Sequence, residues 1–238
     1  MAGFLFLMDF HQDIHPRRFL GSRLYYPCLM NKILIMGPQG SGKGTQAEIL
    51  AKELGIPAIS MGALLRDEIN SGSEAGKLAK DFLDSGKLVP DELALRVVRS
   101  RLDQADAVNG WILDGFPRIM AQAELFLQSI EPTHAILLEI TDDQSLERLS
   151  GRVQCDKCRC GFQLKYVPPK NIGKCDHCDG NLVHRSDDVP EVIKQRLNIY
   201  HQETEPVARR FEEMGILHRV DGSGTIEEVA DEVKKIFV

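Results

Sequence analysis

The stretch that decides the fold reads Lys32-Ile-Leu-Ile-Met36-Gly37-Pro-Gln-Gly40-Ser41-Gly42-Lys43-Gly44-Thr45. Its beginning is a mostly apolar run typical of a strand buried on both faces, and a helical pattern follows from Lys43 to Leu54. The glycines let the backbone curl so that successive N–H groups point at one spot, beside the positive end of the helix. This order of strand, turn and helix predicts a loop that binds nucleotide phosphates, with the Lys43 ammonium on the β and γ phosphates.

Two details of this loop restrict the prediction. Its glycine spacing differs from the G-x-G-x-x-G pattern of dinucleotide-binding folds. Gly44 occupies the position where such loops usually carry Ser or Thr, and Thr45 comes one residue later. We therefore assign no direct hydroxyl ligand of magnesium here. The alternative interpretation is a glycine-rich turn that binds no ligand.

The rest of the chain alternates short apolar segments with helical ones. Strands are expected at 56–59, 111–113, 135–140 and 216–220. Helices are expected over 60–105, with breaks at Gly72, Gly86 and Pro90, and then over 118–130, 142–149, 189–214 and from Thr225 onward. This alternation implies an α/β fold in which helices cover both faces of a parallel sheet.

The composition excludes several classes of protein. The 238 residues are 43% hydrophobic and 27% charged, which suffices for one large core and a small satellite domain. No apolar run approaches the ~18 residues of a membrane-spanning helix, so we expect no membrane partner. The net charge of −6 argues against nucleic acid as a partner. Six cysteines are too few for a disulfide scaffold and favour a reducing compartment, so we expect a cytoplasmic protein.

Residues 1–29 differ from the rest because they show no helical or strand periodicity. They lack the basic start, long apolar stretch and cleavage site of a signal peptide. Their arginines suit a transit peptide, whereas Asp9 and Asp13 do not. We favour a disordered tail, or a start codon placed too early with Met30 as the true first residue. Cys28 is interpreted as a free thiol.

Four cysteines form two hooks, Cys155-x-x-Cys158 and Cys175-x-x-Cys178. Each hook can supply two thiolates from one tight turn, and two hooks suit tetrahedral zinc, with iron as the alternative metal. Cys160 could replace Cys158, although the two-residue gaps favour the four named first. So short a segment cannot bury enough apolar surface to fold alone, and a metal would supply the missing stability.

Further motifs follow the glycine-rich loop in order, namely Ile59-Ser60-x-Gly62-x-x-Leu65-Arg66, Gly86-Lys-Leu-Val89 and Leu113-Asp-Gly-Phe-Pro-Arg118. From about Met30 to the C-terminus the chain resembles the nucleoside monophosphate kinases, and within them the adenylate kinases of the long type with a zinc-containing lid. The resemblance implies a P-loop NTPase-type core (30–59, 90–151 and 189–238), an insertion that binds the nucleoside monophosphate (60–89) and a zinc-binding lid (152–188). It also implies transfer of the terminal phosphoryl group of MgATP to AMP, giving two ADP.

The resemblance assigns charged residues to this reaction. An AMP phosphate is ionised near neutral pH, so catalysis needs alignment and neutralisation of charge rather than a strong base. Guanidinium groups suit this task because each binds two phosphate oxygens in one plane. The implied catalytic residues are Lys43, Asp114, Arg118, Arg152, Arg185 and Arg196. The implied ATP contacts are Gly40, Ser41, Gly42, Lys43, Gly44, Thr45, Arg148 and Arg152.

Three aspartates belong to the same set of motifs. Asp114 ends an apolar strand, where a carboxylate is costly unless it meets a cation. The resemblance implies that it orients magnesium through water, and capping of the Gly115 turn is the alternative. Asp187 and Asp188 are expected to hold arginines and the hinge of the lid rather than to touch substrate.

The acceptor site is assigned in the same way. Gln122 lies one helical turn after Arg118, where its amide can pair with the edge of adenine. Met61 replaces the Thr that the family usually has, and it could fill space against the purine. We expect AMP to be preferred over UMP or CMP. The implied AMP contacts are Ser60, Met61, Arg66, Lys87, Leu88, Val89, Gly115, Arg118, Gln122, Arg185 and Arg196.

Other functions remain as alternatives. Within the enzymes these are a UMP/CMP kinase or an AMP kinase that uses GTP. A different class is an NTP-dependent switch whose zinc ribbon binds nucleic acid, since seven Lys/Arg outnumber three Asp between 152 and 185. Such a switch needs no second phosphate site like the one around Arg66 and Arg118, and interleaved aromatics are lacking. The expected partners are ATP, AMP and ADP, and we expect a monomer.

Overall fold

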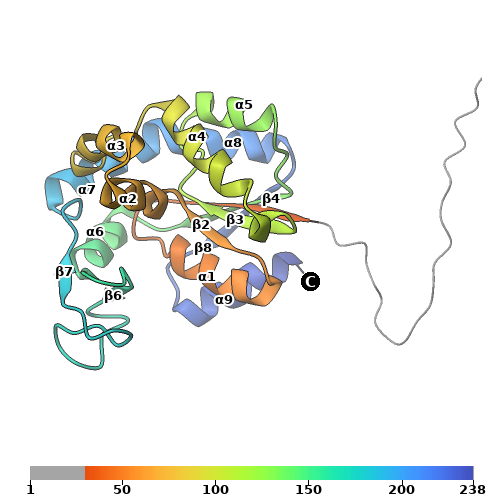
Figure 1. Ribbon diagram of the computed structural model, residues 1–238. Helices are drawn as coiled ribbons and strands as arrows, with labels where there is room; N and C mark the ends of the chain where they lie inside the picture. The colour runs from red at the N-terminus through yellow and green to blue at the C-terminus, as the bar shows by residue number, and fades with distance from the viewer. Residues whose placement is uncertain (1–29, 238) are drawn as a thin grey trace, which may run out of the picture.

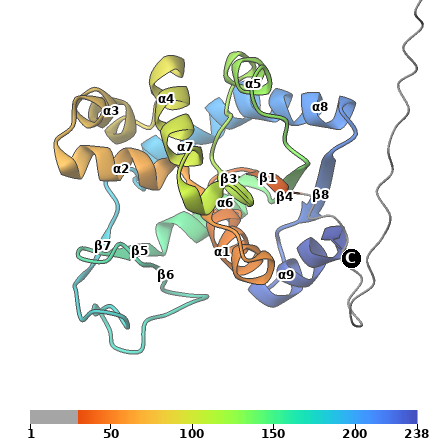
Figure 2. The same ribbon diagram turned by 45° about the vertical axis from the view of Figure 1, so that its right-hand side comes forward.

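A central sheet organises the chain. The computed structural model describes residues 30–237, so the predictions for residues 1–29, including Cys28, lie outside the described part. Five parallel strands pair in the order β2-β3-β1-β4-β8 (Figures 1 and 2). Their bounds are β1 (Asn31–Met36), β2 (Ala58–Ser60), β3 (Gly110–Asp114), β4 (His134–Glu139) and β8 (Leu217–Asp221). The predicted α/β fold with a parallel sheet is confirmed.

Helices cover both faces of this sheet (Figure 2). Their bounds are α1 (Lys43–Leu54), α2 (Met61–Ser71), α3 (Glu74–Asp84), α4 (Asp91–Leu102), α5 (Met120–Leu127), α6 (Asp142–Ser150), α7 (Pro190–Ile199), α8 (Glu205–Glu213) and α9 (Ile226–Lys234), with 3-10 turns at Ala105–Ala107 and Lys235–Phe237. Leu34 and Leu113 enter a core shared with α2, α4, α5 and α8, whereas Ile33 and Ile136 enter a second core with α1 and α9. Successive residues such as Ile33 and Leu34 enter different cores because neighbouring side chains of a strand point to opposite faces of the sheet.

Two elements are shorter than predicted. The strand expected at 56–59 begins at Ala58, because the Ile56 N–H still donates to the Ala51 carbonyl and closes the end of α1. The helix expected over 118–130 begins only at Met120, because Ile119 has an extended backbone (φ −133°, ψ 160°). The predicted breaks at Gly72, Gly86 and Pro90 are confirmed, since each lies directly outside a helix or two residues beyond one.

Two smaller units project from the core. Helices α2 and α3 form the predicted helical insertion between β2 and α4 (Figure 1). The lid contains an antiparallel sheet that the sequence did not predict, in the order β6-β5-β7, with β5 (Arg152–Cys155), β6 (Gly161–Gln163) and β7 (Leu182–His184). These strands are too short to show an alternating pattern. Within residues 30–237, no helix combines the length and apolar character that crossing a bilayer requires.

The helix predicted over 189–214 is continuous but irregular. Between α7 and α8 the chain forms a π-turn at Tyr200–Thr204. Pro206 lies two residues after this turn, and a proline both lacks an N–H and crowds the carbonyl four residues earlier. The wider turn accommodates this residue without ending the helix.

The π-turn places His201 between two carboxylates. Its Nε2 lies 2.9 Å from Asp142 Oδ1 at the start of α6, and its Nδ1 lies 3.1 Å from Glu205 Oε2. Only a protonated imidazole carries hydrogen on both nitrogens, so this geometry favours the imidazolium. The hydrogen bonds to Glu205 and Asp142 raise the pKa of His201 above its usual value.

We expect His201→Gln to destabilise the protein in a pH-dependent way. Because the folded-state pKa is raised, the ion pairs stabilise fully below the unfolded-state value of about 6.5, and less as pH rises through the folded-state value. The side chains are half-exposed, so the loss in unfolding free energy should be about 0.5–1 kcal/mol near pH 6 and close to zero near pH 9. Denaturant titration at both pH values measures it, with the exposed His184→Gln as control. Equal losses at both pH values would contradict the assignment.

Candidate active site and metal cluster

The glycine-rich loop lies between β1 and α1, as predicted. Gly37 and Gly42 have φ values of 138° and 90°, which disfavour any residue with a side chain. A Cβ at Gly37 would also lie 2.3 Å from the Leu138 carbonyl oxygen of the neighbouring strand. The loop therefore needs glycine for its backbone path, and it leads directly into the positive N-terminal end of α1.

Lys43 lies in the mouth of this loop. Its ammonium donates hydrogen bonds to the carbonyls of Gly37 (2.9 Å) and Pro38 (2.7 Å). Burial lowers its pKa to about 8; Asp114 opposes the shift, while Arg118 and other nearby arginines add to it. A positive group held among other positive groups is stabilised by an anion, so this position suits a phosphate.

Lys43 belongs to a cluster of cations drawn from the core, the insertion and the lid. Burial, followed by the charge of Arg185, lowers the pKa of Arg66 to about 10. Burial also lowers the pKa of Arg118, and it lowers that of Arg196 to about 10. Burial is the main cause of these shifts, and the positive charge of neighbouring arginines adds to each of them, which places the groups close together. The members are Lys43, Arg66, Arg118, Arg152, Arg185 and Arg196.

Two aspartates hold the lid-side arginines of this cluster. Arg152 donates to both oxygens of Asp188 at 2.6 and 2.5 Å, and Arg185 donates to both oxygens of Asp187 at 2.8 and 2.6 Å. Arg196 reaches Asp187 Oδ2 at 3.0 Å. Burial would raise the pKa of Asp187, but the charges of Arg185, Arg196 and Arg152 and the hydrogen bonds from Arg185 lower it to about 2. The Asp187 carboxylate thus stays ionised, and the hydrogen bonds of both aspartates fix the guanidinium groups.

Arg118 and Gln122 are each held by hydrogen bonds of their own. The Arg118 guanidinium Nε donates to the Gly115 carbonyl at 2.8 Å. The Gln122 amide is only 3% exposed; its Oε1 accepts from the Arg118 backbone N–H (3.0 Å) and its Nε2 donates to Asp91 Oδ1 (2.8 Å). Sequence reasoning did not single out Asp91, since an acidic residue after Pro90 resembles an ordinary helix start.

The remaining predicted residues occupy several environments. Ser41 is buried in the loop, while Gly44 and Thr45 are exposed at the start of α1. Met61 and Val89 lie in the core shared with α2 and α4, Ser60 and Leu88 are half-buried, and Lys87 is exposed. Arg148 lies outside the cation cluster, where it donates to the carbonyls of Gly40 (3.4 Å) and Ser223 (3.2 Å).

The lid and the insertion meet over the cluster. Arg159 of the lid donates to Asn70 Oδ1 of α2 at 3.2 Å, and Ser186 donates to Asp84 Oδ1 of α3 at 3.4 Å. A cavity of about 120 Å³ between them is bordered by Arg66 and by other residues of both units. These two contacts were not predicted, because neither unit's sequence identifies the other's position.

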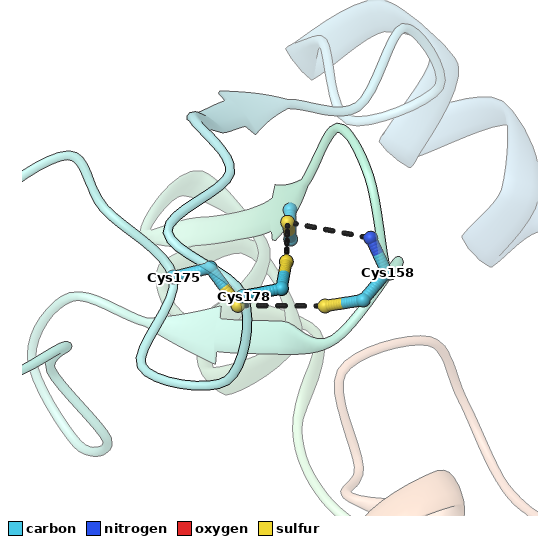
Figure 3. A group of neighbouring side chains, drawn as sticks. Cys158, Cys175 and Cys178 are labelled. Carbon is cyan, nitrogen blue, oxygen red and sulfur yellow. Dashed lines mark hydrogen bonds between the residues drawn. The ribbon is translucent and has the colours of Figure 1, made fainter.

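The four predicted thiols converge in the lid, and Figure 3 labels three of them, Cys158, Cys175 and Cys178. The sulfur atoms of Cys155, Cys158, Cys175 and Cys178 all lie within 4.8 Å of one another. Burial raises the pKa of the Cys155 thiol. The backbone N–H groups of Cys158 and Lys157 donate to the Cys155 sulfur, and they lower this pKa to about 6. Cys160 is not in this cluster. Four sulfurs at one point, with backbone donors directed at them, suit a tetrahedral metal.

Comparison with known proteins identifies the family. The model of the adenylate kinase family matches residues 35–216. The chain belongs to the adenylate kinase family. The adenylate kinase of Caldicellulosiruptor saccharolyticus is 42% identical over 211 residues, covering 87% of this chain and 97% of that protein. Those of Syntrophomonas wolfei subsp. wolfei (42% over 210 residues, 86% and 98% covered) and Archaeoglobus fulgidus (40% over 210 residues, 86% and 97% covered) are similar as well.

Membership of the adenylate kinases confirms three predictions at once. The resemblance, the enzyme class and the reaction, ATP and AMP to two ADP, agree with the family model and the relatives. The cysteine cluster is consistent with the long form of adenylate kinase that carries a zinc lid. The roles of individual residues remain predictions.

Proposed function

We propose that this adenylate kinase binds ATP and AMP head to head across the cation cluster. An oxygen of the AMP phosphate attacks the γ phosphorus of ATP; the bond from that phosphorus to the bridging oxygen breaks, and ADP leaves as its β phosphate takes the charge. The supporting observation is that six cationic side chains converge from core, insertion and lid, against the carboxylates Asp114, Asp187 and Asp188. Such an excess of positive charge fits two phosphate chains.

On the donor side, the loop N–H groups and Lys43 hold the β and γ phosphates. Arg152, Arg185 and Arg196 bind the transferring group, and the partly buried Asp187 keeps two of them in place. Arg148 lies beside Gly40 at the rim of the loop, which suits contact with the adenosine part of ATP.

On the acceptor side, Arg66 and Arg118 bind the AMP phosphate. The Gln122 amide pairs with the adenine edge, and Met61 and Val89 border the nucleotide from the buried side. The contacts between lid and insertion exclude water, so the phosphoryl group reaches AMP rather than water.

Magnesium and zinc fit residues of this chain. Among the described residues, the buried Asp114 Oδ1 has no hydrogen-bond partner, and a hydrated cation would satisfy it. Magnesium bound with ATP would neutralise phosphate charge there. We propose zinc rather than iron for the four thiolates because zinc is the usual metal of closed tetrahedral structural sites.

We also propose the unit boundaries and the setting of the protein. The core comprises 30–59, 90–151 and 189–238, the insertion 60–89 and the lid 152–188. A lid and an insertion that both move fit a monomer most easily. The described cysteines carry no disulfide, which suits a cytoplasmic protein.

A coupled assay of ADP formation with defined donor and acceptor pairs tests this proposal. We expect ATP with AMP to exceed ATP with UMP or CMP, and GTP with AMP, by at least about tenfold in kcat/KM, because buried polar groups left unpaired by a wrong base weaken binding. Faster UMP turnover would overturn the acceptor assignment. Binding of RNA without phosphoryl transfer would favour the switch.

A further inference from the structure

The Gln122 amide is held between two partners of opposite kind. α4 and α5 pack against each other, which brings Asp91 at the start of α4 to Gln122 on the first turn of α5. Gln122 Nε2 donates to Asp91 Oδ1 at 2.8 Å, and Gln122 Oε1 accepts from the Arg118 backbone N–H at 3.0 Å. The amide is almost completely buried, so water does not compete at these positions.

This pair of partners allows only one orientation of the amide. An ionised carboxylate can only accept hydrogen bonds, and a backbone N–H can only donate one. Turning the amide over would place Oε1 against the Asp91 carboxylate and Nε2 against the Arg118 N–H. Both contacts would then be repulsive, and two buried groups would lose their partners.

The fixed amide retains one hydrogen and one lone pair. Nε2 carries two hydrogens and gives one to Asp91; Oε1 has two lone pairs and uses one for Arg118. The unused pair complements an adenine edge, where N1 accepts and the 6-amino group donates. Hypoxanthine has the reverse pattern, because its N1 carries hydrogen and its 6-oxygen accepts. An amide in the opposite orientation would match hypoxanthine instead.

We infer that Asp91 is a positioning residue that sets the base preference of the acceptor site by fixing the orientation of Gln122. The inference rests on the proposed contact between Gln122 and adenine. Asp91 acts through Gln122 and does not touch the nucleotide. It makes the site selective between two purines of nearly the same shape, which steric fit alone separates poorly.

The test is Asp91→Asn, assayed with AMP and with inosine monophosphate, which bears hypoxanthine. Asn can accept from Gln122 or donate to it, so only the Arg118 backbone N–H still favours one orientation, and the amide turned over no longer faces a repulsive carboxylate. We expect the ratio of kcat/KM for AMP to that for inosine monophosphate to fall about tenfold, mainly through a higher KM for AMP. The KM for ATP should stay unchanged. A ratio within about twofold of the wild-type value would overturn the inference.

Two further variants separate this role from a structural one. Glu92→Gln removes the same charge from the same helical turn at an exposed position, and it should leave the ratio unchanged. Gln122→Met should lower the ratio by itself, and adding Asp91→Asn to it should change nothing more. If Gln122→Met left the ratio intact, the adenine contact within the proposed function would fail. If only Asp91→Asn left it intact, the inference alone would fail.

Discussion

Replacing Lys43 by methionine should lower kcat by about 10³-fold or more. The ammonium is the one charge of the core placed inside the glycine-rich loop, where it bonds the carbonyls of Gly37 and Pro38. In the reaction it stabilises charge that moves onto the β–γ bridge, and losing one such preorganised group typically costs two to three orders of magnitude or more. Steady-state kinetics with saturating ATP and AMP measure the loss. Methionine keeps most of the length and apolar character of the side chain.

The stability of the same variant should move in the opposite direction. The pKa of Lys43 is lowered to about 8 by burial, which means that the folded protein without nucleotide holds the charged form at a cost. Removing the charge should therefore leave the melting temperature unchanged or higher. Lys52→Met, in the last turn of the same helix, provides the matched control and should retain full activity. If Lys43→Met kept activity within about tenfold of wild type, Lys43 would not have the assigned role.

The sequence predicts the fold where local chemistry is sufficient. The loop around Lys43 follows from glycine spacing between a strand and a helix, and both are found where expected. The two CxxC hooks likewise predict which four sulfurs meet, and Cys160 is found outside their cluster. In both cases the residues of the motif lie within a few tens of positions of one another, and each key position requires one type of residue.

The remaining features depend on contacts between distant segments. Asp91 and Gln122 are 31 positions apart, and nothing local to either indicates the other. The contact of Arg159 with Asn70 spans 89 positions between two units. The sequence indicated that Asp187 and Asp188 hold arginines. It did not indicate which arginine each aspartate binds.

The adjacent carboxylates of Asp187 and Asp188 explain how the cation cluster can form before substrate binds. Arginines that face one another repel, and burial strengthens the repulsion. Asp187 and Asp188 offset it for Arg152, Arg185 and Arg196 by direct hydrogen bonds. Phosphate oxygens can then take the guanidinium hydrogens that remain, so binding needs little reorganisation of the site.

Cys175→Ser should remove the metal and unfold the lid while the core stays folded. The lid has a very small core around Val153 and Phe162, which cannot support a three-stranded sheet without a metal. We expect bound zinc to fall from about one equivalent to below half, and the melting temperature to fall by roughly 5–10 °C, as loss of about 2–3 kcal/mol implies for a chain of this size. Metal analysis and calorimetry measure the two quantities.

Cys160→Ser supplies the control for this prediction, because Cys160 lies in the same lid but outside the four-sulfur cluster. It should keep a full equivalent of metal and the wild-type melting temperature. Hydrogen exchange then shows which part of the protein unfolds. The backbone amides of β5 and β7 should lose protection against exchange in Cys175→Ser, whereas those of β1 and β4 should keep it. A full equivalent of metal in Cys175→Ser, or equal loss in both variants, would contradict the four-thiolate assignment. Loss of protection throughout the core would instead mean that the lid and the core unfold as one cooperative unit.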